Sequence, residues 1–322
     1  MNEDWPKTRE ITVPPRGAGL RLDRLLHAFF KDWSRTELVK GIKQGQVCDT
    51  HGKPMRPSTR VRAGQRIVIG IPGIAPTEPP PTFPPILFED DTVVVVHKPA
   101  GMVAHPSGSA FTWSVIALAR LRWPTAEMDL CHRLDKDTSG VLVLTKDKGA
   151  NQRIKSAFKA GDVEKTYEAI CKGVIPWEEH TCTAPIGPRG EEIRVQQGVR
   201  DDGAFATTTV VVLDRAESLT RVRCIIGTGR THQIRVHLEH LGFPIVGDRL
   251  YGVPPEVFLH TLTHGQDMWA REQAGAPRHA LHCKEMRFPH PTQGVITVAA
   301  SIPDDMERWW HRPECLPHDL HD

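Results

Sequence analysis

A run of prolines divides this 322-residue chain and limits what can fold on either side of it. The run consists of Pro72, Pro76, Pro79, Pro80, Pro81, Pro84 and Pro85. Because proline lacks a backbone N–H and fixes φ, this density prevents a regular helix or sheet and favours an extended polyproline II segment. We interpret residues 73–85 as a stiff linker, since a proline-rich ligand motif is the rarer explanation. The predicted domains are therefore residues 1–72 and 86–312, followed by a tail over residues 313–322.

The first of these domains carries the positive charge of the chain. Residues 1–72 hold 14 Lys and Arg against 7 Asp and Glu, a net charge of +7. The remainder holds 27 against 32, a net charge of −5, and the two nearly cancel in the total of +2. A basic module joined to a mildly acidic body suggests that the first part binds a polyanion. Surface solubility alone would explain the imbalance equally well.

Apolar residues at helical spacing predict two short helices in the basic module. They are Leu22, Leu25, Leu26 and Phe29 in the first helix, and Leu38 and Ile42 in the second. Ser34 is a suitable N-cap for the second helix. Strands are expected near residues 46–49 and 66–71, which completes a small α+β module. Arg35, Lys40 and Lys43 lie on or beside the second helix, where they could contact phosphates.

The larger domain is predicted to have the α+β class, with a mixed, largely antiparallel sheet flanked by helices. Its strand candidates are rich in β-branched residues. They are Val93–Val96, Val141–Thr145, Thr166–Cys171, Thr207–Leu213, Arg221–Ile226 and Val295–Ala299. One helix is expected between Asp147 and Gly161, and another from Thr231 to Leu241.

A dense run of polar residues, from Cys131 to Gly140, ends where the hydrophobic strand at Val141 begins. A loop at the edge of a rigid strand is a common place for reactive groups, because the strand fixes its position while the side chains stay accessible. From spacing alone, a charged surface turn is the more ordinary interpretation.

This run, H-R-L-D-K-D-T-S-G from His132 to Gly140, closely resembles the catalytic signature of the RluA family of pseudouridine synthases. Three further segments resemble the family's motifs in the same order: K-P-A-G from Lys98, K-T-Y-E-A from Lys165, and G-R-T-H-Q-I-R-V-H-L from Gly229. A G-D to Y-G element follows at residues 247–252. The basic module, with R-L-D at residues 21–23 and S-R at 34–35, looks like the S4 RNA-binding domain that often precedes this catalytic domain.

The resemblance assigns three residues to catalysis. It implies that Asp135 is the catalytic aspartate, that Arg230 is its guanidinium partner, and that Tyr167 is the active-site tyrosine. Forming pseudouridine requires an anionic group near ribose C1′, and an adjacent guanidinium lowers the cost of keeping a buried carboxylate ionised. Core packing would also explain Tyr167, and a helix-edge or phosphate contact would also explain Arg230.

Further residues of the same motifs are candidates for RNA contact. Arg133 is placed to contact the backbone of a flipped nucleotide or to fill its vacated space, or else to anchor the loop. Lys98 of the K-P-A-G segment and His132, which begins the signature, are also expected to bind RNA.

The remaining features of the sequence argue against a disulfide-bonded, a membrane-spanning or a metal-dependent protein. The seven cysteines are odd in number and form no C-x-x-C, so we expect reduced thiols and a cytoplasmic protein. No apolar run approaches a membrane span. The seventeen histidines, including His232, His237 and His240 and the pair His260 and His264, lack acidic partners at zinc-motif spacing, and no metal or cofactor is expected.

The sequence therefore predicts a cofactor-independent RNA pseudouridine synthase that acts as a monomer on structured RNA. Ribosomal RNA of the large subunit is the leading substrate. Transfer RNA is the alternative substrate, and a non-catalytic RNA-binding assembly protein is the alternative function. No role is assigned to residues 177–206 or to the region after Pro303.

Overall fold

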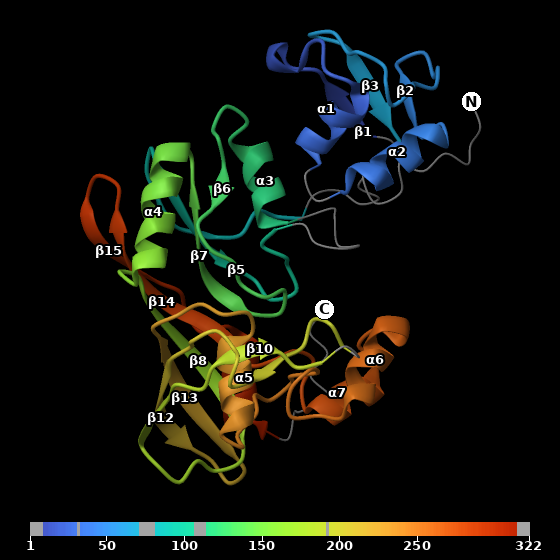
Figure 1. Ribbon diagram of the computed structural model, residues 1–322. Coiled ribbons are helices and arrows are strands. Elements are labelled where there is room, and N and C mark those ends of the chain that lie inside the picture. Colours follow the sequence, from blue (N-terminus) through green and yellow to red (C-terminus); the bar gives the residue numbers. More distant parts are fainter. Residues whose placement is uncertain (1–8, 31–32, 71–80, 106–113, 191–192, 314–322) are drawn as a thin grey trace. The chain divides into compact units, whose positions relative to one another are not determined.

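The computed structural model describes the chain except residues 1–8, 31–32, 71–80, 106–113, 191–192 and 314–322 (Figure 1). Much of the expected linker, and nearly all of the expected tail, thus lie outside the described residues. The chain forms two compact units, residues 1–83 with 105–122 and residues 84–104 with 123–322. Helix α3 (Val115–Arg122) groups with the first unit, although the predicted boundaries place it in the second domain.

The first unit contains the expected α+β module. Its antiparallel sheet has the order β1-β3-β2. The elements are β1 (Arg9–Thr12), α1 (Leu22–Phe29), α2 (Arg35–Lys43), β2 (Val47–Asp49) and β3 (Arg66–Ile69), with a short 3-10 helix at Pro15–Gly17. Ser34 caps α2 in a reciprocal capping box with Glu37, as the sequence predicts for the N-cap.

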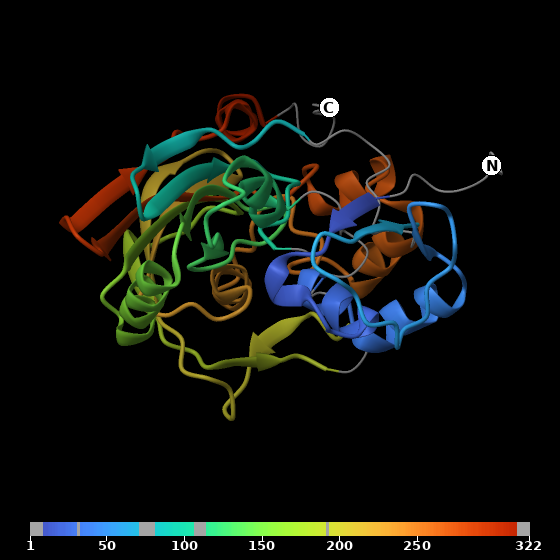
Figure 2. The ribbon, with the colours of Figure 1, turned by 90° about the horizontal axis from the view of Figure 1, so that it is seen from above.

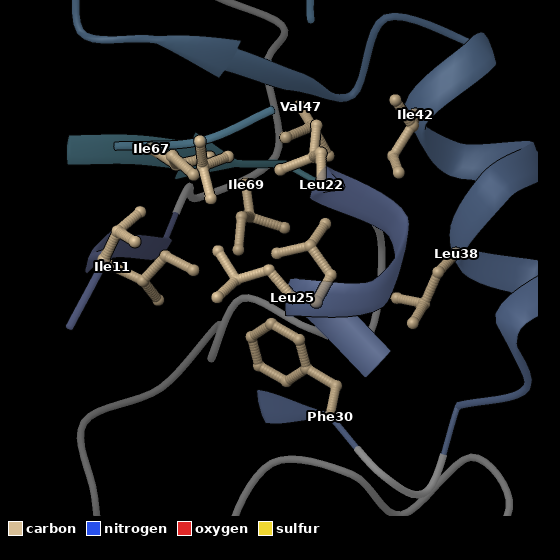
Figure 3. Packing of buried hydrophobic residues seen from close by; sticks show 12 residues of the cluster. Ile11, Leu22, Leu25, Phe30, Leu38, Ile42, Val47, Ile67 and Ile69 are labelled. Atoms are coloured by element: carbon tan, nitrogen blue, oxygen red, sulfur yellow. The ribbon is translucent and has the colours of Figure 1, made fainter. Parts of the chain in front are cut away.

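Side chains from both helices and the sheet meet in one small core (Figure 3). Leu22, Leu25 and Leu26 of α1 are all at most 1% exposed, as their spacing predicts. Phe29 is instead 39% exposed, because α1 ends at this residue and the next one, Phe30, turns into the core.

The second unit is built on one large, mostly antiparallel sheet, which confirms the predicted fold class. The strand order is β4-β5-β7-β14-β8-β13-β12-β9, with β15 paired to β14 and β6 to β7. The strands are β4 (Ile86–Glu89), β5 (Val93–Lys98), β6 (Asp129–Leu130), β7 (Ser139–Thr145), β8 (Glu164–Lys172), β9 (Glu179–Cys182), β12 (Thr208–Arg215), β13 (Leu219–Ile226), β14 (Leu281–His290) and β15 (Gly294–Ala299). All six predicted strands are present; β14, at the centre, was not predicted.

The one parallel pairing on this sheet's main path joins β7 to β14 and depends on a glycine. Gly140 has φ 116°, and a Cβ at this position would lie 2.1 Å from the carbonyl oxygen of Cys283. Only glycine permits this close approach of the two backbones. The strand that follows the polar loop is therefore fixed at the middle of the sheet.

Helices cover both faces of this sheet (Figures 1 and 2). Helix α4 (Lys148–Ala160) is capped by Asp147, ends at Gly161 as expected, and packs on β6, β7 and β14. Helix α5 (Gln233–His240) packs on β12 and on β11 (Gln197–Val199), which pairs with β10 (Ile186–Pro188). The remaining helices are α6 (Pro255–His264), α7 (Met268–Ala274) and α8 (Asp304–His311). None of the described helices is both long and apolar enough to cross a bilayer.

Two regions without a predicted role have definite structure. Residues 177–206 contribute β9 to the sheet edge and form the small β10–β11 pair. After Pro303, helix α8 buries Trp309 and Trp310, which are 1% and 9% exposed.

Candidate active site

Asp135 lies on a loop that is held from several sides before β7 begins. The neighbouring Lys136 carbonyl accepts a hydrogen bond from Lys98 Nζ at 2.9 Å. Asp137 pairs with Arg249, and the Thr138 hydroxyl lies 2.8 Å from His279 Nε2. These contacts fix the three residues that directly follow Asp135, and such support around a reactive side chain is what a precise site needs.

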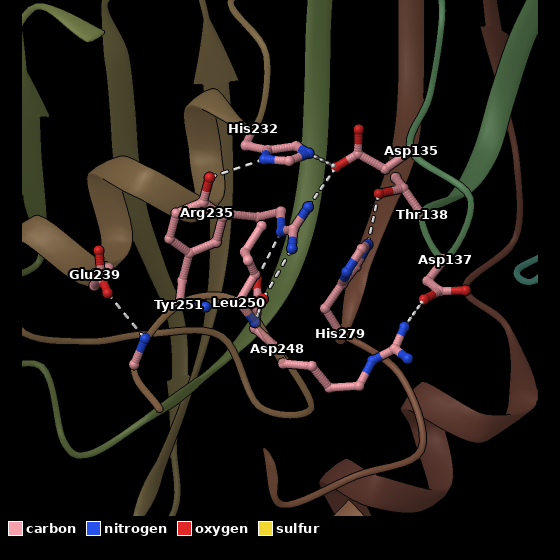
Figure 4. A network of polar contacts seen from close by, with 12 residues as sticks. Asp135, Asp137, Thr138, His232, Arg235, Glu239, Asp248, Leu250, Tyr251 and His279 are labelled. Atoms are coloured by element: carbon pink, nitrogen blue, oxygen red, sulfur yellow. Dashed lines mark hydrogen bonds and ion pairs between the residues drawn. The ribbon is translucent and has the colours of Figure 1, made fainter. Parts of the chain in front are cut away.

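The partner of Asp135 comes from the first turn of α5. Arg235 Nη1 donates a hydrogen bond to Asp135 Oδ2 at 2.8 Å, and its Nε and Nη2 donate to Asp248 at 2.6 and 2.9 Å (Figure 4). The guanidinium is thus fixed by one fully buried carboxylate while it contacts another that is 32% exposed. A planar fork of donors is suited to this double role.

The electrostatic environment keeps Asp135 ionised. Burial alone would raise the pKa of its carboxyl group, but the positive charge of Arg235, supported by Lys98, more than offsets it and lowers the pKa below the usual value. The result is a carboxylate that remains charged at neutral pH and still presents part of its surface. Such a group can attack an electrophilic carbon or stabilise positive charge on a sugar.

Arg230 does not fill the role predicted for it. Its Nε donates to the Phe205 carbonyl at 2.9 Å, and the residue is exposed. Arg230 stands before α5, which begins at Gln233, whereas Arg235 lies in the first turn of the helix and its guanidinium reaches Asp135. The predicted guanidinium partner is corrected to Arg235, and the exposed position of Arg230 fits the phosphate contact that was its alternative.

Lys98 is also placed differently from its prediction as an RNA-binding residue. It is 0% exposed, and its Nζ donates to the carbonyls of Pro99, Met102 and Lys136. Burial lowers its pKa to about 7. A lysine with all three donors satisfied by backbone cannot reach RNA, so its role here is to join the K-P-A-G segment to the Asp135 loop.

His132 and Arg133, the two residues before Leu134, differ in their accessibility to RNA. The Nε2 of His132 accepts a hydrogen bond from the Val143 backbone, its ring stacks on Phe158, and burial lowers its pKa to about 3. A neutral, anchored imidazole does not serve as the predicted phosphate contact. Arg133 is exposed, and the described residues provide no hydrogen-bond partner for its side chain, which leaves it accessible to RNA.

Tyr167 lies on β8, and its hydroxyl is close enough to Asp135 for the carboxylate to influence it electrostatically. Its neighbour Glu168 points to the opposite face, where Arg221 joins it to Glu307 of α8. Burial raises the pKa of Tyr167 well above 10, and Cys283 and Asp135 raise it further. The residue is only 7% exposed, so a neutral phenol borders the site with little ring face available for a base to stack on.

Two of the basic residues predicted on α2 are exposed in the first unit, and the third is partly engaged. Arg35 donates to Asp23 through Nε and Nη2, at 2.9 and 2.6 Å, while Lys40 and Lys43 are exposed. A shallow cavity of about 450 Å³ is lined by basic and apolar groups. Its lining residues are Arg21, Asp23, Arg35, Thr36, Val39, Lys43 and Pro57.

Three of the histidines that were considered as metal ligands, His237, His260 and His264, make other contacts. His237 lies 2.9 Å from both the Thr208 hydroxyl and the Ala184 carbonyl. The rings of His260 and His264 stack with centroids 4.3 Å apart. Within the described part of the chain, no group of three or more His, Cys, Asp or Glu side chains is arranged to hold a metal ion.

Sequence reasoning missed Arg235 and Asp248, although both stand inside the motifs quoted for the resemblance. The available signal was that both are charged residues inside motifs of the resemblance. The sequence does not show that these two motifs are adjacent in space. Residues His232 and Tyr251 beside them were likewise not assigned.

Comparison with known proteins identifies the family of this chain. Residues 92–240 match the family model described as RNA pseudouridylate synthase. The chain is 36% identical to a ribosomal large subunit pseudouridine synthase D of Xanthomonas campestris, over 93% of this chain and 91% of the relative. A protein of the same name from Pseudomonas aeruginosa is 35% identical, over 92% and 93%.

Solved structures give the same result. The human RNA pseudouridylate synthase domain containing 1 protein is 27% identical with a TM-score of 0.56, covering 76% of this chain and 94% of that one. The human domain containing 4 protein is 26% identical with a TM-score of 0.54, over 71% and 92%. The sequence motifs, the carboxylate–guanidinium site and these relatives together establish that the chain belongs to the RNA pseudouridine synthase family.

Proposed function

We propose that this protein converts specific uridines of large-subunit ribosomal RNA to pseudouridine, with Asp135 as the catalytic carboxylate. The observation that carries the proposal is the ionised, partly exposed Asp135 held 2.8 Å from the buried Arg235. The substrate is inferred from relatives that match nearly the full chain and are named for the large ribosomal subunit.

The formation of pseudouridine requires an anionic group next to the nucleotide, and Asp135 provides one. The bond between uracil N1 and ribose C1′ breaks, the base turns, a bond forms between C5 and C1′, and the proton leaves C5 while N1 gains one. No electron is gained or lost overall. Asp135 acts on the sugar, through attack at C1′ or a glycal, or on the base; the geometry is compatible with each route.

Tyr167 is proposed to border the uracil as a neutral phenol. Its high pKa makes it a hydrogen-bond donor and not a base in the ground state. Arg133 is proposed to contact the extruded nucleotide or to fill the space it leaves, because it is an exposed cation two residues before Asp135.

The first unit is proposed to act as an S4-like RNA-binding domain. Its support is the net charge of +7 over residues 1–72 and the exposed Lys40 and Lys43 on α2, with Arg35 beside them. Phosphate contacts from such a surface would hold a structured RNA without selecting the base. A cytoplasmic location is proposed together with this substrate, and the cysteines that the structure describes are free and buried.

The test is release of tritium to water from large-subunit ribosomal RNA transcribed with uridine labelled at C5. The native protein should release tritium without added metal or cofactor. Asp135→Asn should lower the rate constant by at least about 10³-fold, as loss of one member of a catalytic unit does, while RNA binding persists.

Asp129→Asn is the matched control, since Asp129 is a half-exposed carboxylate that pairs with Lys155 outside the site. It should retain full activity. Faster release from transfer RNA would replace the proposed substrate, and RNA binding without release from any RNA would support the non-catalytic alternative.

A further inference from the structure

His232 has an unusual backbone at the edge of the site. Its φ is 57°, and it is the one non-glycine residue with positive φ in the described chain. A non-glycine side chain in the left-handed region is unfavourable and persists where surrounding contacts require it. Here the residue is the N-cap of α5, and its ring lies beside Asp135 and Tyr251 (Figure 4).

A chain of hydrogen bonds determines which ring nitrogen of His232 carries the proton. The backbone N–H of Gln197, on β11, donates to the Tyr251 hydroxyl oxygen at 2.9 Å. The Tyr251 oxygen lies 2.8 Å from His232 Nδ1. Because burial raises the pKa of Tyr251, its hydroxyl stays protonated and can donate a hydrogen bond to Nδ1. A neutral His232 therefore carries its own hydrogen on Nε2.

That Nε2 faces the catalytic carboxylate. It lies 3.8 Å from Asp135 Oδ2, the same oxygen that accepts from Arg235. This separation is beyond a hydrogen bond, but catalytic contacts in ligand-free sites are often long and tighten when substrate binds. Burial lowers the pKa of His232 to about 4, so it acts as a neutral donor near neutral pH.

We propose that His232 is a positioning residue, locked by Tyr251 as the Nε2–H tautomer so that it donates to Asp135 and fixes the carboxylate against the nucleotide. The inference rests on the proposed role of Asp135 and adds a second donor to the one from Arg235. It also gives a function to the β10–β11 region, since Gln197 of β11 supplies the first donor of the chain.

Two substitutions separate this role from a purely structural one. In His232→Gln the side-chain amide can place a donor near the position of Nε2. In His232→Asn the amide oxygen can accept from Tyr251 as Nδ1 does, but no donor reaches Asp135. Asparagine also tolerates the left-handed backbone better than glutamine. Of the two variants, His232→Asn should therefore be the more stable and His232→Gln the more active.

We expect His232→Asn to lower kcat at saturating RNA by at least about tenfold, the order of losing a hydrogen bond to a charged group. His232→Gln should retain several-fold more activity than His232→Asn, although it unfolds at a lower temperature. KM for RNA should change little in both. Equal or greater activity of the asparagine variant would overturn the proposal.

A direct measurement of the tautomer completes the test. Nitrogen NMR of histidine-labelled protein should show His232 protonated at Nε2 in the native chain. Tyr251→Phe keeps the ring but removes the hydroxyl, and it should abolish this tautomer preference. A native His232 protonated at Nδ1 would exclude the proposed role. This readout does not need activity, so it stays informative if the proposed RNA substrate is wrong.

Discussion

At the scale of single residues, the aspartate could be predicted from sequence and its partner could not. The signature from His132 to Gly140 is contiguous, so Asp135 follows from the motif alone. Arg230 and Arg235 share a second motif, and choosing between them requires knowing where α5 begins. The helix begins at Gln233, after the left-handed His232, and Arg235 in its first turn is the residue that contacts Asp135.

The corrected partner gives a paired prediction. In Arg235→Lys, one ammonium group cannot contact both Asp135 and Asp248, as the guanidinium does. We expect kcat to fall by at least about tenfold and the protein to lose stability, since the buried Asp248 keeps an imperfect partner. Arg230→Lys should leave kcat nearly unchanged.

Steady-state kinetics and thermal unfolding of both variants provide the measurement. An Arg230→Lys protein with the larger loss in kcat would restore the partner first inferred from the sequence. A loss confined to KM in Arg230→Lys would instead agree with the phosphate contact that its exposed position allows.

At the scale of secondary structure elements, β-branched runs identified strands well and left one central strand unrecognised. Strand β14, with the sequence L-H-C-K-E-M-R-F-P-H, contains no β-branched residue and has a proline, so propensity alone does not reveal it. Its place is set by tertiary pairing with β7, β8 and β15. Periodicity also could not show that α1 ends at Phe29 and leaves that ring exposed.

The contact between the end of β5 and the Asp135 loop can be tested by mutation. Lys98, at the end of β5, is the buried donor to three carbonyls, one of them in the loop. In Lys98→Met these acceptors lose their partner, which should cost about 3 kcal/mol of stability and reduce kcat by loosening the loop. RNA affinity should be nearly unchanged, because Lys98 is fully buried.

Lys136→Met is the matched control, since this neighbouring lysine is exposed and contributes its carbonyl, and not its side chain, to the contact. Denaturant unfolding and tritium release distinguish the two variants. Weakened RNA binding in Lys98→Met with unchanged stability would return Lys98 to the RNA-contact role predicted from its motif.

At the scale of the whole molecule, charge and chemistry are divided between the two units. The first unit has a compact core of its own and a basic helix α2, while the second holds Asp135, Arg235 and the large sheet. The division by charge could be predicted from composition, because it needs only counting along the chain. The grouping of residues 105–122 with the first unit could not, because it depends on contacts distant in sequence.

If this division holds in function, removing positive charge from α2 should weaken binding without touching the chemical step. We expect the double variant Lys40→Gln, Lys43→Gln to lower RNA affinity and to reduce the slope of log affinity against log salt concentration by about 1 to 2, as loss of one or two phosphate contacts does. The rate constant at saturating RNA should stay within about twofold of the native value, since Asp135 and Arg235 are unchanged. A variant with Lys148→Gln and Lys159→Gln on α4 carries the same change of charge at exposed positions of the second unit. If both variants lost affinity equally, net charge and not the basic helix would govern binding, and the first unit would need another role.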